Sequence, residues 1–421
     1  MRILICGANG FIGRALAARL SAAGHEVVRG VRTPGASSNN AEIAIDFARD
    51  VDTATWLPRL AGIDAVINAV GILVEGSGKT FDAIHSRAPQ ALFAAARAAG
   101  VKRVVQISAL GADAGNTPYF TTKRAADDFL MTQPLEWQVL RPALVYGDDG
   151  ASAGFFRMLA SLPLAVLPGD GRHPVQPVHI DDLTEAVARL LDPAAPARQC
   201  IDLVGATAVE YREMLRIYRA AMGFAQAPQI GIPAPLIGLA AHALAWLPGA
   251  MLTPDTWKML RTGNTGDVAA TARLLGRAPR GLRDFIGAPQ RVALRHEALA
   301  VWRNLLLRGV LAVVWLASGL ISACVMPAAQ GLELLGRVGI AGSLAPLALY
   351  GSAALDAAFG IATLLAPGRR LWLAQIALVG FYTVVIGGYM PEFLTHPFGP
   401  LLKNLPILAI LILLYAEEQP T

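Results

Sequence analysis

Met1-Arg-Ile-Leu-Ile-Cys-Gly-Ala-Asn-Gly-Phe-Ile-Gly-Arg14 is the stretch that decides the fold. Residues 3–6 are a short apolar run, which is typical of a buried parallel strand. Gly7, Gly10 and Gly13 follow at once, and an alanine- and leucine-rich segment that favours a helix comes next. Glycines let backbone N–H groups approach a pyrophosphate, and the helix dipole favours its negative charge. The stretch therefore predicts a dinucleotide-binding turn; a tight turn in another kind of α/β protein is the alternative.

The second predicted strand, residues 24–32, indicates which dinucleotide is bound. In NAD-selective sites an acidic residue near the end of this strand bonds the ribose hydroxyls. Here the end is Val31-Arg32-Thr33-Pro34, which contains no acid. A guanidinium can hold a 2′-phosphate through two parallel hydrogen bonds, so Arg32, with Arg29 or Arg14, favours NADP, with NAD as the alternative. In the other interpretation Arg32 is only a solvated charge at a strand end.

A serine and a Tyr-x-x-x-Lys pair predict the reaction centre. Ser108 lies near the carboxyl end of the predicted strand 101–112, the end at which open parallel sheets bind ligands. Tyr119 and Lys123 are four residues apart and share one face of a helix. The ammonium group is expected to lower the pKa of the phenol, which would exchange a proton with a carbonyl or alcohol while hydride moves to or from a nicotinamide. Ser108 would hold the same oxygen.

Residues 1 to about 287 resemble the extended and atypical short-chain dehydrogenases/reductases. The resemblance rests on the glycine turn at 7–13, on Tyr119 to Lys123, on the Leu-Arg-Pro-Ala-Leu-Val-Tyr-Gly run that ends at Gly147, and on residues 177–182. It extends to the nucleotide-binding accessory subunit of respiratory complex I and to NmrA-like proteins. It implies an α/β fold with a doubly wound parallel Rossmann sheet and a small C-terminal lobe, without implying a substrate.

The resemblance also implies which residues contact the cofactor. Asp46 takes the place that contacts adenine, and the turn after the predicted strand 63–71 lines the cofactor. The implied set is Gly7, Asn9, Gly10, Phe11, Ile12, Gly13, Arg32, Asp46, Ala69, Val70, Gly71, Tyr119, Lys123, Pro142, Ala143 and Val145. His85, where the family often has asparagine, is interpreted as a polar contact and not as a catalyst. His179, just before a helix predicted to be capped by an aspartate, is interpreted as structural.

Composition indicates a membrane part. Hydrophobic residues make up 54% of the chain and charged residues only 16%, which is too apolar for an ordinary soluble protein. The excess lies after residue 304, where four spans are predicted at roughly 307–326, 340–365, 371–390 and 401–415. A buried helical bundle is the alternative. The net charge of +5 comes from scattered arginines and does not suggest nucleic-acid binding; the three cysteines predict buried thiols, with no metal or disulfide set.

Charge placement predicts the orientation. Arg295, Arg303 and Arg308 precede the first span, and Arg369-Arg370 lie between the second and third. By the positive-inside rule these flanks face the cytoplasm, which predicts a multi-pass protein of the inner membrane with its nucleotide-binding part on the cytoplasmic side.

The predicted membrane part contains a buried acid and a family motif. Asp356 lies in the middle of the second predicted span, where a carboxylate costs about 2.5–3.5 kcal/mol on insertion scales. We expect it to face a partner, for which Lys403, His396 and Glu392 are candidates. The stretch 397–406 resembles the last-helix motif of DoxX-like membrane domains, and that resemblance covers about 305–418.

Together these observations predict an NAD(P)-binding domain at 1–290, a linker at 291–303 and a DoxX-like four-helix transmembrane domain at 304–421. The predicted activity is NADPH-linked reduction of a carbonyl or quinone-like lipophilic substrate, with membrane lipid as a contact and a membrane-protein partner left open. The alternative is a non-catalytic NADPH-binding sensor or scaffold.

Overall fold

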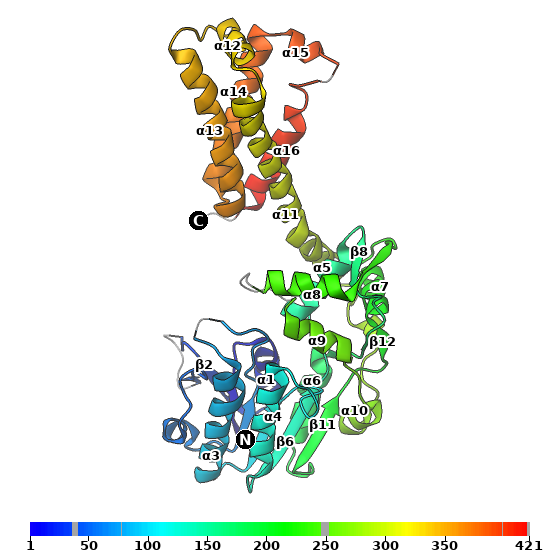
Figure 1. Cartoon of the computed structure of the whole chain (residues 1–421). Coiled ribbons are helices and arrows are strands. Elements are labelled where there is room, and N and C mark those ends of the chain that lie inside the picture. The colour runs from blue at the N-terminus through cyan, green and yellow to red at the C-terminus, as the bar shows by residue number, and fades with distance from the viewer. Residues whose placement is uncertain (36–40, 77, 246–251, 398, 419–421) are drawn as a thin grey trace. The chain divides into compact units, whose positions relative to one another are not determined.

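The computed structural model describes residues 1–35, 41–76, 78–245, 252–397 and 399–418. They divide into two units, Met1–Ala298 and Leu299–Thr421, which are drawn in Figure 1. The predicted linker, 291–303, lies within the long helix α11 (Arg291–Leu320), whose first residues belong to the first unit.

A seven-stranded parallel sheet forms the centre of the first unit, in the order β11-β6-β5-β4-β1-β2-β3. The strand that carries the deciding stretch, β1, is paired on both sides, with Leu4 opposite Val28 of β2 and Val66 of β4. The strand order reverses at this point, which confirms a doubly wound sheet and puts the switch point beside the glycine turn. The strands are β1 (Arg2–Cys6), β2 (Glu26–Val31), β3 (Glu42–Ala44), β4 (Ala65–Asn68), β5 (Arg103–Ile107), β6 (Glu136–Pro142) and β11 (Gln199–Leu203).

Helices cover both faces of this sheet because alternate strand residues point to opposite sides. Ile3 and Ile5 pack with one layer, made by α1 (Phe11–Ala22), α6 (Ile180–Leu190) and α10 (Val268–Leu275). Leu4 and Cys6 pack with the other layer, made by α2 (Thr53–Trp56), α3 (Ala88–Ala98) and α4 (Pro118–Met131). These four side chains are completely buried, which explains why residues 3–6 of the opening strand are apolar without alternation.

Two local features differ from the sequence predictions. The helix expected over 81–100 begins as a π-helix, Asp82–Arg87, before α3. Pro89 lacks the N–H that an α-helical bond to His85 would need, which accounts for the wider turn just before it. The helix α6 is capped by His179, whose Nδ1 accepts from the Asp181 N–H at 3.2 Å. The expected aspartate cap is therefore wrong, because the aspartates lie in the first turn instead.

A small lobe follows the sheet, as expected. Its core contains Tyr146, Met214, Tyr218 and Phe285. Its helices are α5 (Ala151–Ser161), α7 (Tyr211–Ala221), α8 (Ala234–Leu244) and α9 (Pro254–Thr262). Its strands pair as β7 (Val145–Tyr146) with β10 (Val178–His179), β8 (Ala165–Pro168) with β13 (Gln229–Ile232), and β9 (Pro174–Val175) with β12 (Val209–Glu210).

The second unit is helical, and among its described residues three helices are long and apolar enough to cross a membrane. They are α11 with its π-helical continuation to Val325, α13 (Leu344–Leu365) and α14 (Arg369–Tyr389). The fourth predicted span corresponds to α16 (Asn404–Glu417), whose 14 residues rise only about 21 Å. The remaining helices are α12 (Ala328–Arg337) and α15 (Glu392–Thr395).

Polar contacts tie these apolar helices together. Gln375 accepts from the Trp315 indole at 2.8 Å and donates to Thr363 at 2.9 Å. The expectation for Asp356 is not met by the described residues: its Oδ1 is buried without a hydrogen-bond partner, and Glu392 pairs with Arg337. Glu392 carries the same negative charge as Asp356, so it pairs with the arginine and not with Asp356.

Of the cysteines, only Cys6 is buried, while Cys200 and Cys324 are exposed. The prediction of three buried thiols is therefore wrong for two of them. Cys200 lies on β11, an edge strand of the sheet, and Cys324 lies on the outer face of an apolar helix.

Candidate active site

The turn after β1 is shaped to receive a phosphate. Gly7 has a φ of +80°, and the Gly10 N–H donates to the Gly7 carbonyl at 2.8 Å. Gly10 is the N-cap of α1, and no side chain caps that end. A Cβ on Gly13 would lie 2.1 Å from the Gly7 oxygen, so the helix begins in contact with the turn. The first N–H groups of α1 are therefore left for an anion, as a dinucleotide pyrophosphate requires.

Replacing Gly13 by Ala is expected to abolish nucleotide binding. The added Cβ meets backbone of the turn, which must move and so misaligns the N–H groups of the phosphate cradle. The expected result is loss of the NADPH-dependent rise in melting temperature. Gly336→Ala is the matched control, since a Cβ there meets nothing within 4 Å. Binding by Gly13→Ala equal to that of the control would contradict this assignment.

The ends of neighbouring strands meet at this turn. A Cβ on Gly7 would lie 3.0 Å from Val70 and 3.3 Å from the Ala69 carbonyl, after β4. One on Gly71 would lie 3.3 Å from Lys123 Nζ. The structure therefore brings three sets of predicted cofactor residues together: the glycine turn, the β4 turn and the lysine of α4.

Other predicted cofactor residues lie at the same edge of the sheet. Phe11 packs against the segment after β6, because a Cβ on Gly147 would lie 2.6 Å from its ring. Pro142 ends β6, and the Ala143 N–H donates to Leu203 at 2.9 Å. Val145 pairs with Val178 in the short β7–β10 ladder. Asp46 lies after β3, where its carboxylate accepts from the Ala48 N–H at 3.1 Å.

The arginines expected to bind a 2′-phosphate are held differently from one another. Arg29 donates to the Asn9 side chain at 2.7 Å and pairs with Glu42 at 3.3 Å. Arg14 donates to the Asn9 carbonyl at 2.9 Å and pairs with Asp149. Arg32 is exposed, and within the described part of the chain no carboxylate pairs with it. The pairing of Glu42 with Arg29 was not predicted, because Glu42 belongs to the next strand. Since Arg29 and Arg14 are paired with carboxylates, Arg32 is the arginine of the three best placed to bind a phosphate.

Lys123 lies deep in the site. Its ammonium donates to the Ile107 carbonyl at 3.1 Å and to the Val70 carbonyl at 3.5 Å. Burial lowers the pKa of Lys123 to about 8, and the nearby carboxylate of Asp127 opposes that shift. The protonation state of Lys123 therefore changes with pH in the range around pH 8.

Tyr119 lies one turn before this lysine on α4, in a cluster of rings. Its ring meets those of Phe81, His85 and Phe120 edge to face, at centroid distances of 6.0, 5.3 and 5.4 Å. Burial, with a smaller contribution from Asp127, raises the pKa of Tyr119 to about 12. The net shift is therefore upward, and the predicted lowering of this pKa toward neutral pH is not seen in the chain's own groups. At neutral pH the phenol is protonated and suited to donate.

His85 serves as a hydrogen-bond acceptor. Its Nε2 accepts from the Ile72 N–H at 3.0 Å, so the neutral ring carries its proton on Nδ1, which faces the Thr122 hydroxyl at 3.4 Å. Burial and then the charge of Lys123 lower the pKa of His85 to about 2. The ring stays neutral, which supports the interpretation of a polar contact.

Ser108 is held by a residue that the sequence reasoning missed. Its hydroxyl donates to Asp127 Oδ2 at 2.5 Å. Asp127 is completely buried, and burial raises its pKa to about 6 against the Ser108 hydrogen bond and the charges of Lys123 and Arg141. The available signal was spacing: Tyr119, Lys123 and Asp127 recur every four residues and so share one helix face.

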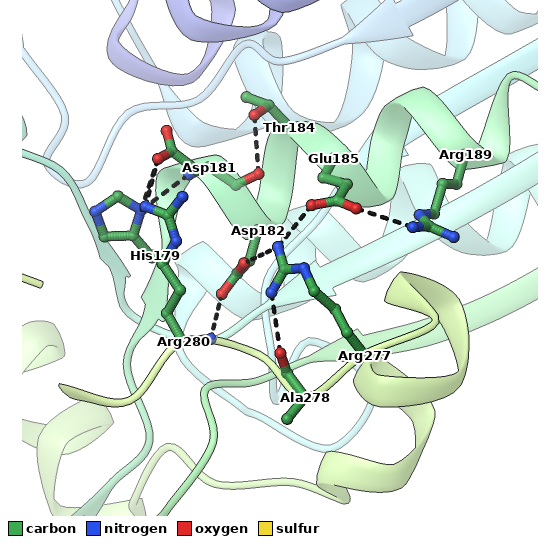
Figure 2. A network of polar contacts seen from close by, with 9 residues as sticks. All are labelled: His179, Asp181, Asp182, Thr184, Glu185, Arg189, Arg277, Ala278 and Arg280. Carbon is green, nitrogen blue, oxygen red and sulfur yellow. Dashed lines mark hydrogen bonds and ion pairs between the residues drawn. The ribbon is translucent and has the colours of Figure 1, made fainter. Parts of the chain in front are cut away.

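A second polar network fixes the start of α6, as Figure 2 shows. Asp182 accepts from the Arg277 guanidinium and from the Arg280 N–H, both at 2.7 Å, while Arg280 also contacts Asp181 and His179. The His179 ring lies 5.2 Å from that of Phe285. These contacts bind the segment after α10 to α6 and support the structural interpretation of His179.

Two families match this chain. Residues 7–159 match an NAD(P)H-binding family and residues 312–412 match a DoxX-like family. The chain thus carries an NAD(P)-binding Rossmann domain followed by a DoxX-like domain, as predicted.

Among curated proteins, the mitochondrial NADH dehydrogenase (ubiquinone) 1 alpha subcomplex subunit 9 of Arabidopsis thaliana is 27% identical over 229 residues, which are 51% of this chain and 56% of that protein. A ceramide reductase of Caulobacter vibrioides is 28% identical over 193 residues, 45% of this chain and 59% of that protein. The chain therefore spans less than two thirds of the length of both relatives.

Among solved structures, an NADPH-dependent quinone oxidoreductase of Escherichia coli, solved with NADPH, has a TM-score of 0.54 at 19% identity. The match covers 68% of this chain and 98% of that one. This similarity shows that the chain shares the NAD(P)-binding fold of that protein.

Proposed function

We propose that this chain, in which an NAD(P)-binding domain precedes a DoxX-like domain, is an NADPH-linked reductase of a lipophilic carbonyl or quinone-like substrate. The observation that supports the proposal is the position of Lys123, whose ammonium donates to the Val70 and Ile107 carbonyls. Val70 adjoins Gly7 of the glycine turn, and Tyr119 lies one turn before Lys123 on α4. The names of two relatives, a ceramide reductase and a quinone oxidoreductase, support the same class of substrate.

The site supplies a proton in this reaction. A bound nicotinamide would supply the hydride. Tyr119, protonated at neutral pH, gives the Oη proton to the substrate oxygen as that oxygen gains charge. Lys123, beside it on α4, stabilises the phenolate that remains. Ser108 donates to the same oxygen once its hydroxyl proton turns away from Asp127, to which it donates in this structure.

The membrane part motivates a lipophilic substrate, because a soluble substrate gives no reason to tether the enzyme. Arg303 pairs with Glu417, Arg308 donates to the Thr363 carbonyl at 3.1 Å, and Arg369 lies over the Tyr415 ring. These contacts gather basic residues at one end of the second unit. By the positive-inside rule we expect that end to face the cytoplasm, the side that we also propose for the nucleotide-binding domain.

Arg32 is expected to select NADPH. Arg32→Glu should weaken NADPH binding by roughly 10–100-fold, which corresponds to loss of a charge-assisted hydrogen bond of about 1.5–3 kcal/mol, and leave NADH binding nearly unchanged. Fluorescence titration with both nucleotides measures the ratio. Arg97→Ala, at an exposed arginine on α3, is the control. Equal affinity of the unaltered protein for the two nucleotides would contradict the role of Arg32.

A scaffold is the second candidate, and one observation favours it. The Ser108 hydroxyl is already engaged by Asp127, which suits a site that binds a nucleotide without reacting. In this case NADPH stabilises the fold and the DoxX-like domain contacts another membrane protein.

One experiment separates the two candidates. Protein reconstituted in lipid is titrated with NADPH, and then a short-chain quinone or a long-chain ketone is added while NADPH absorbance is followed. Oxidation that depends on acceptor and protein supports the reductase. Tight NADPH binding without oxidation by either acceptor class would overturn it in favour of the scaffold.

A further inference from the structure

One face of the lobe leaves large apolar side chains uncovered. Val166 of β8 and Ile230 of β13 are in register, so they stand side by side on the same face of this two-stranded sheet, and both are exposed. The helix that follows, α8, exposes Leu236 and Leu239 to 55% and 69%. Because α8 begins two residues after β13 ends, these exposed apolar side chains are close in the chain. We treat them as one patch, since clustered exposed apolar side chains mark interaction sites.

This patch lies near the residue at which the first unit ends. The Ser161 hydroxyl contacts the Ala298 carbonyl at 3.3 Å, and the exposed Leu164 follows three residues later, just before β8. Figure 1 shows β8 and α5 next to the start of α11. After Ala298 the same helix continues into the apolar segment that is long enough to cross a membrane. The patch is therefore tethered to that segment by a short stretch of chain.

One basic group lies near the Leu164 end of the patch, and a second lies beside the first. Arg219 donates to the Leu162 carbonyl at 2.7 Å, two residues before Leu164. Arg295 donates to the Gly223 carbonyl at 2.7 Å and lies over the Phe224 ring. The charge of Arg295 also reaches Arg219, whose pKa is lowered by burial and by this neighbour. Guanidinium groups beside exposed leucines favour one surface above others, the headgroup region of an anionic bilayer.

We propose that this patch, formed by Leu164, Val166, Ile230, Leu236 and Leu239 and named the lobe face, lies in the headgroup region of the bilayer that holds the apolar helices. A tether this short keeps lipid at high effective concentration around the lobe, and the two arginines complement anionic headgroups. The inference goes beyond the proposed reaction and does not depend on turnover. It makes the lobe a peripheral membrane anchor in addition to the DoxX-like domain.

The test uses the full chain in liposomes that contain anionic lipid. Cys200→Ser and Cys324→Ser remove the exposed thiols, and Cys6 is buried. In this background Leu239→Cys supplies a single accessible thiol, which carries an environment-sensitive fluorophore. A small share of the lipid carries a nitroxide quencher on its headgroup. A cysteine at position 98, exposed at the end of α3, is the matched control. The assay needs no catalytic activity, so its failure is distinguishable from failure of the proposed reaction.

If the lobe face lies among the headgroups, quenching should be several-fold stronger at position 239 than at position 98. A blue-shifted but unquenched fluorophore at 239 would show that protein covers the lobe face, either a second copy or a partner, and would overturn it. Equal, weak quenching at both positions, with a solvent-like emission, would overturn it as well. Replacing Arg219 and Arg295 by Gln should reduce the quenching at 239 without changing that at 98.

Discussion

Tyr119→Phe is expected to lower kcat by roughly 10²–10⁴-fold, the usual contribution of a general acid, while NADPH binding is kept. The substitution removes only the hydroxyl, and the ring keeps its edge-to-face contacts with Phe81, His85 and Phe120. Those contacts hold the position of the ring, so the loss would be chemical. Initial rates of NADPH oxidation and a fluorescence titration on the same sample measure the two quantities.

Tyr211→Phe is the matched control for this variant. Tyr211 is buried, whereas Tyr119 is half-buried, and it lies on α7 in the core of the lobe. Its hydroxyl should therefore be dispensable for turnover. Unchanged kcat in Tyr119→Phe would remove the proton donor from the proposed mechanism. Loss of NADPH binding along with turnover would assign the residue a binding role only.

Asp127→Asn is expected to shift the basic limb of the pH–rate profile downward. The carboxylate favours the charged form of Lys123, whose pKa is about 8. Without it the pKa of Lys123 should fall further, because a close opposite charge favours the charged form. The lysine then loses its proton below pH 8, so the variant should lose more activity at pH 8 than at pH 6.

Asp128→Asn provides the comparison, since this neighbour on α4 is exposed. It should leave the profile unchanged. A merely structural role of Asp127 would lower activity at all pH values alike and leave the shape of the profile intact. That outcome, or a profile equal to that of Asp128→Asn, would contradict the electrostatic link between Asp127 and Lys123.

The fold was predictable because its strongest signals are local. An apolar run of four residues, a glycine turn and a helix start occur within 14 residues. Their order along the chain is the strand–turn–helix order that a dinucleotide-binding fold needs. The apolar helices after residue 304 are equally local, since length and composition define them. The spacing of Tyr119 and Lys123 placed both on one helix face without any knowledge of the tertiary structure.

The parts that were missed depend on contacts between distant segments. Ser108 and Asp127 are 19 residues apart, and only packing of α4 on β5 brings the carboxylate to the hydroxyl. Glu42 reaches Arg29 across a strand pair. The pKa of Tyr119 depends on how deeply its ring is buried, which sequence spacing does not reveal. Sequence thus predicted which groups react, which stays a prediction, and the structure was needed to find the contacts around those groups.

The most direct test of the central claim follows the hydrogen itself. Two samples of NADPH, each deuterated on one of the two faces of nicotinamide C4, are oxidised by the reconstituted protein with a lipophilic acceptor. The NADP⁺ formed is then analysed by mass. If the protein catalyses hydride transfer, the label is lost completely from one face and retained from the other, because a protein-bound nicotinamide presents a single face to its acceptor. Oxidation without facial selectivity, or no NADP⁺ beyond the amount formed without protein, would contradict it.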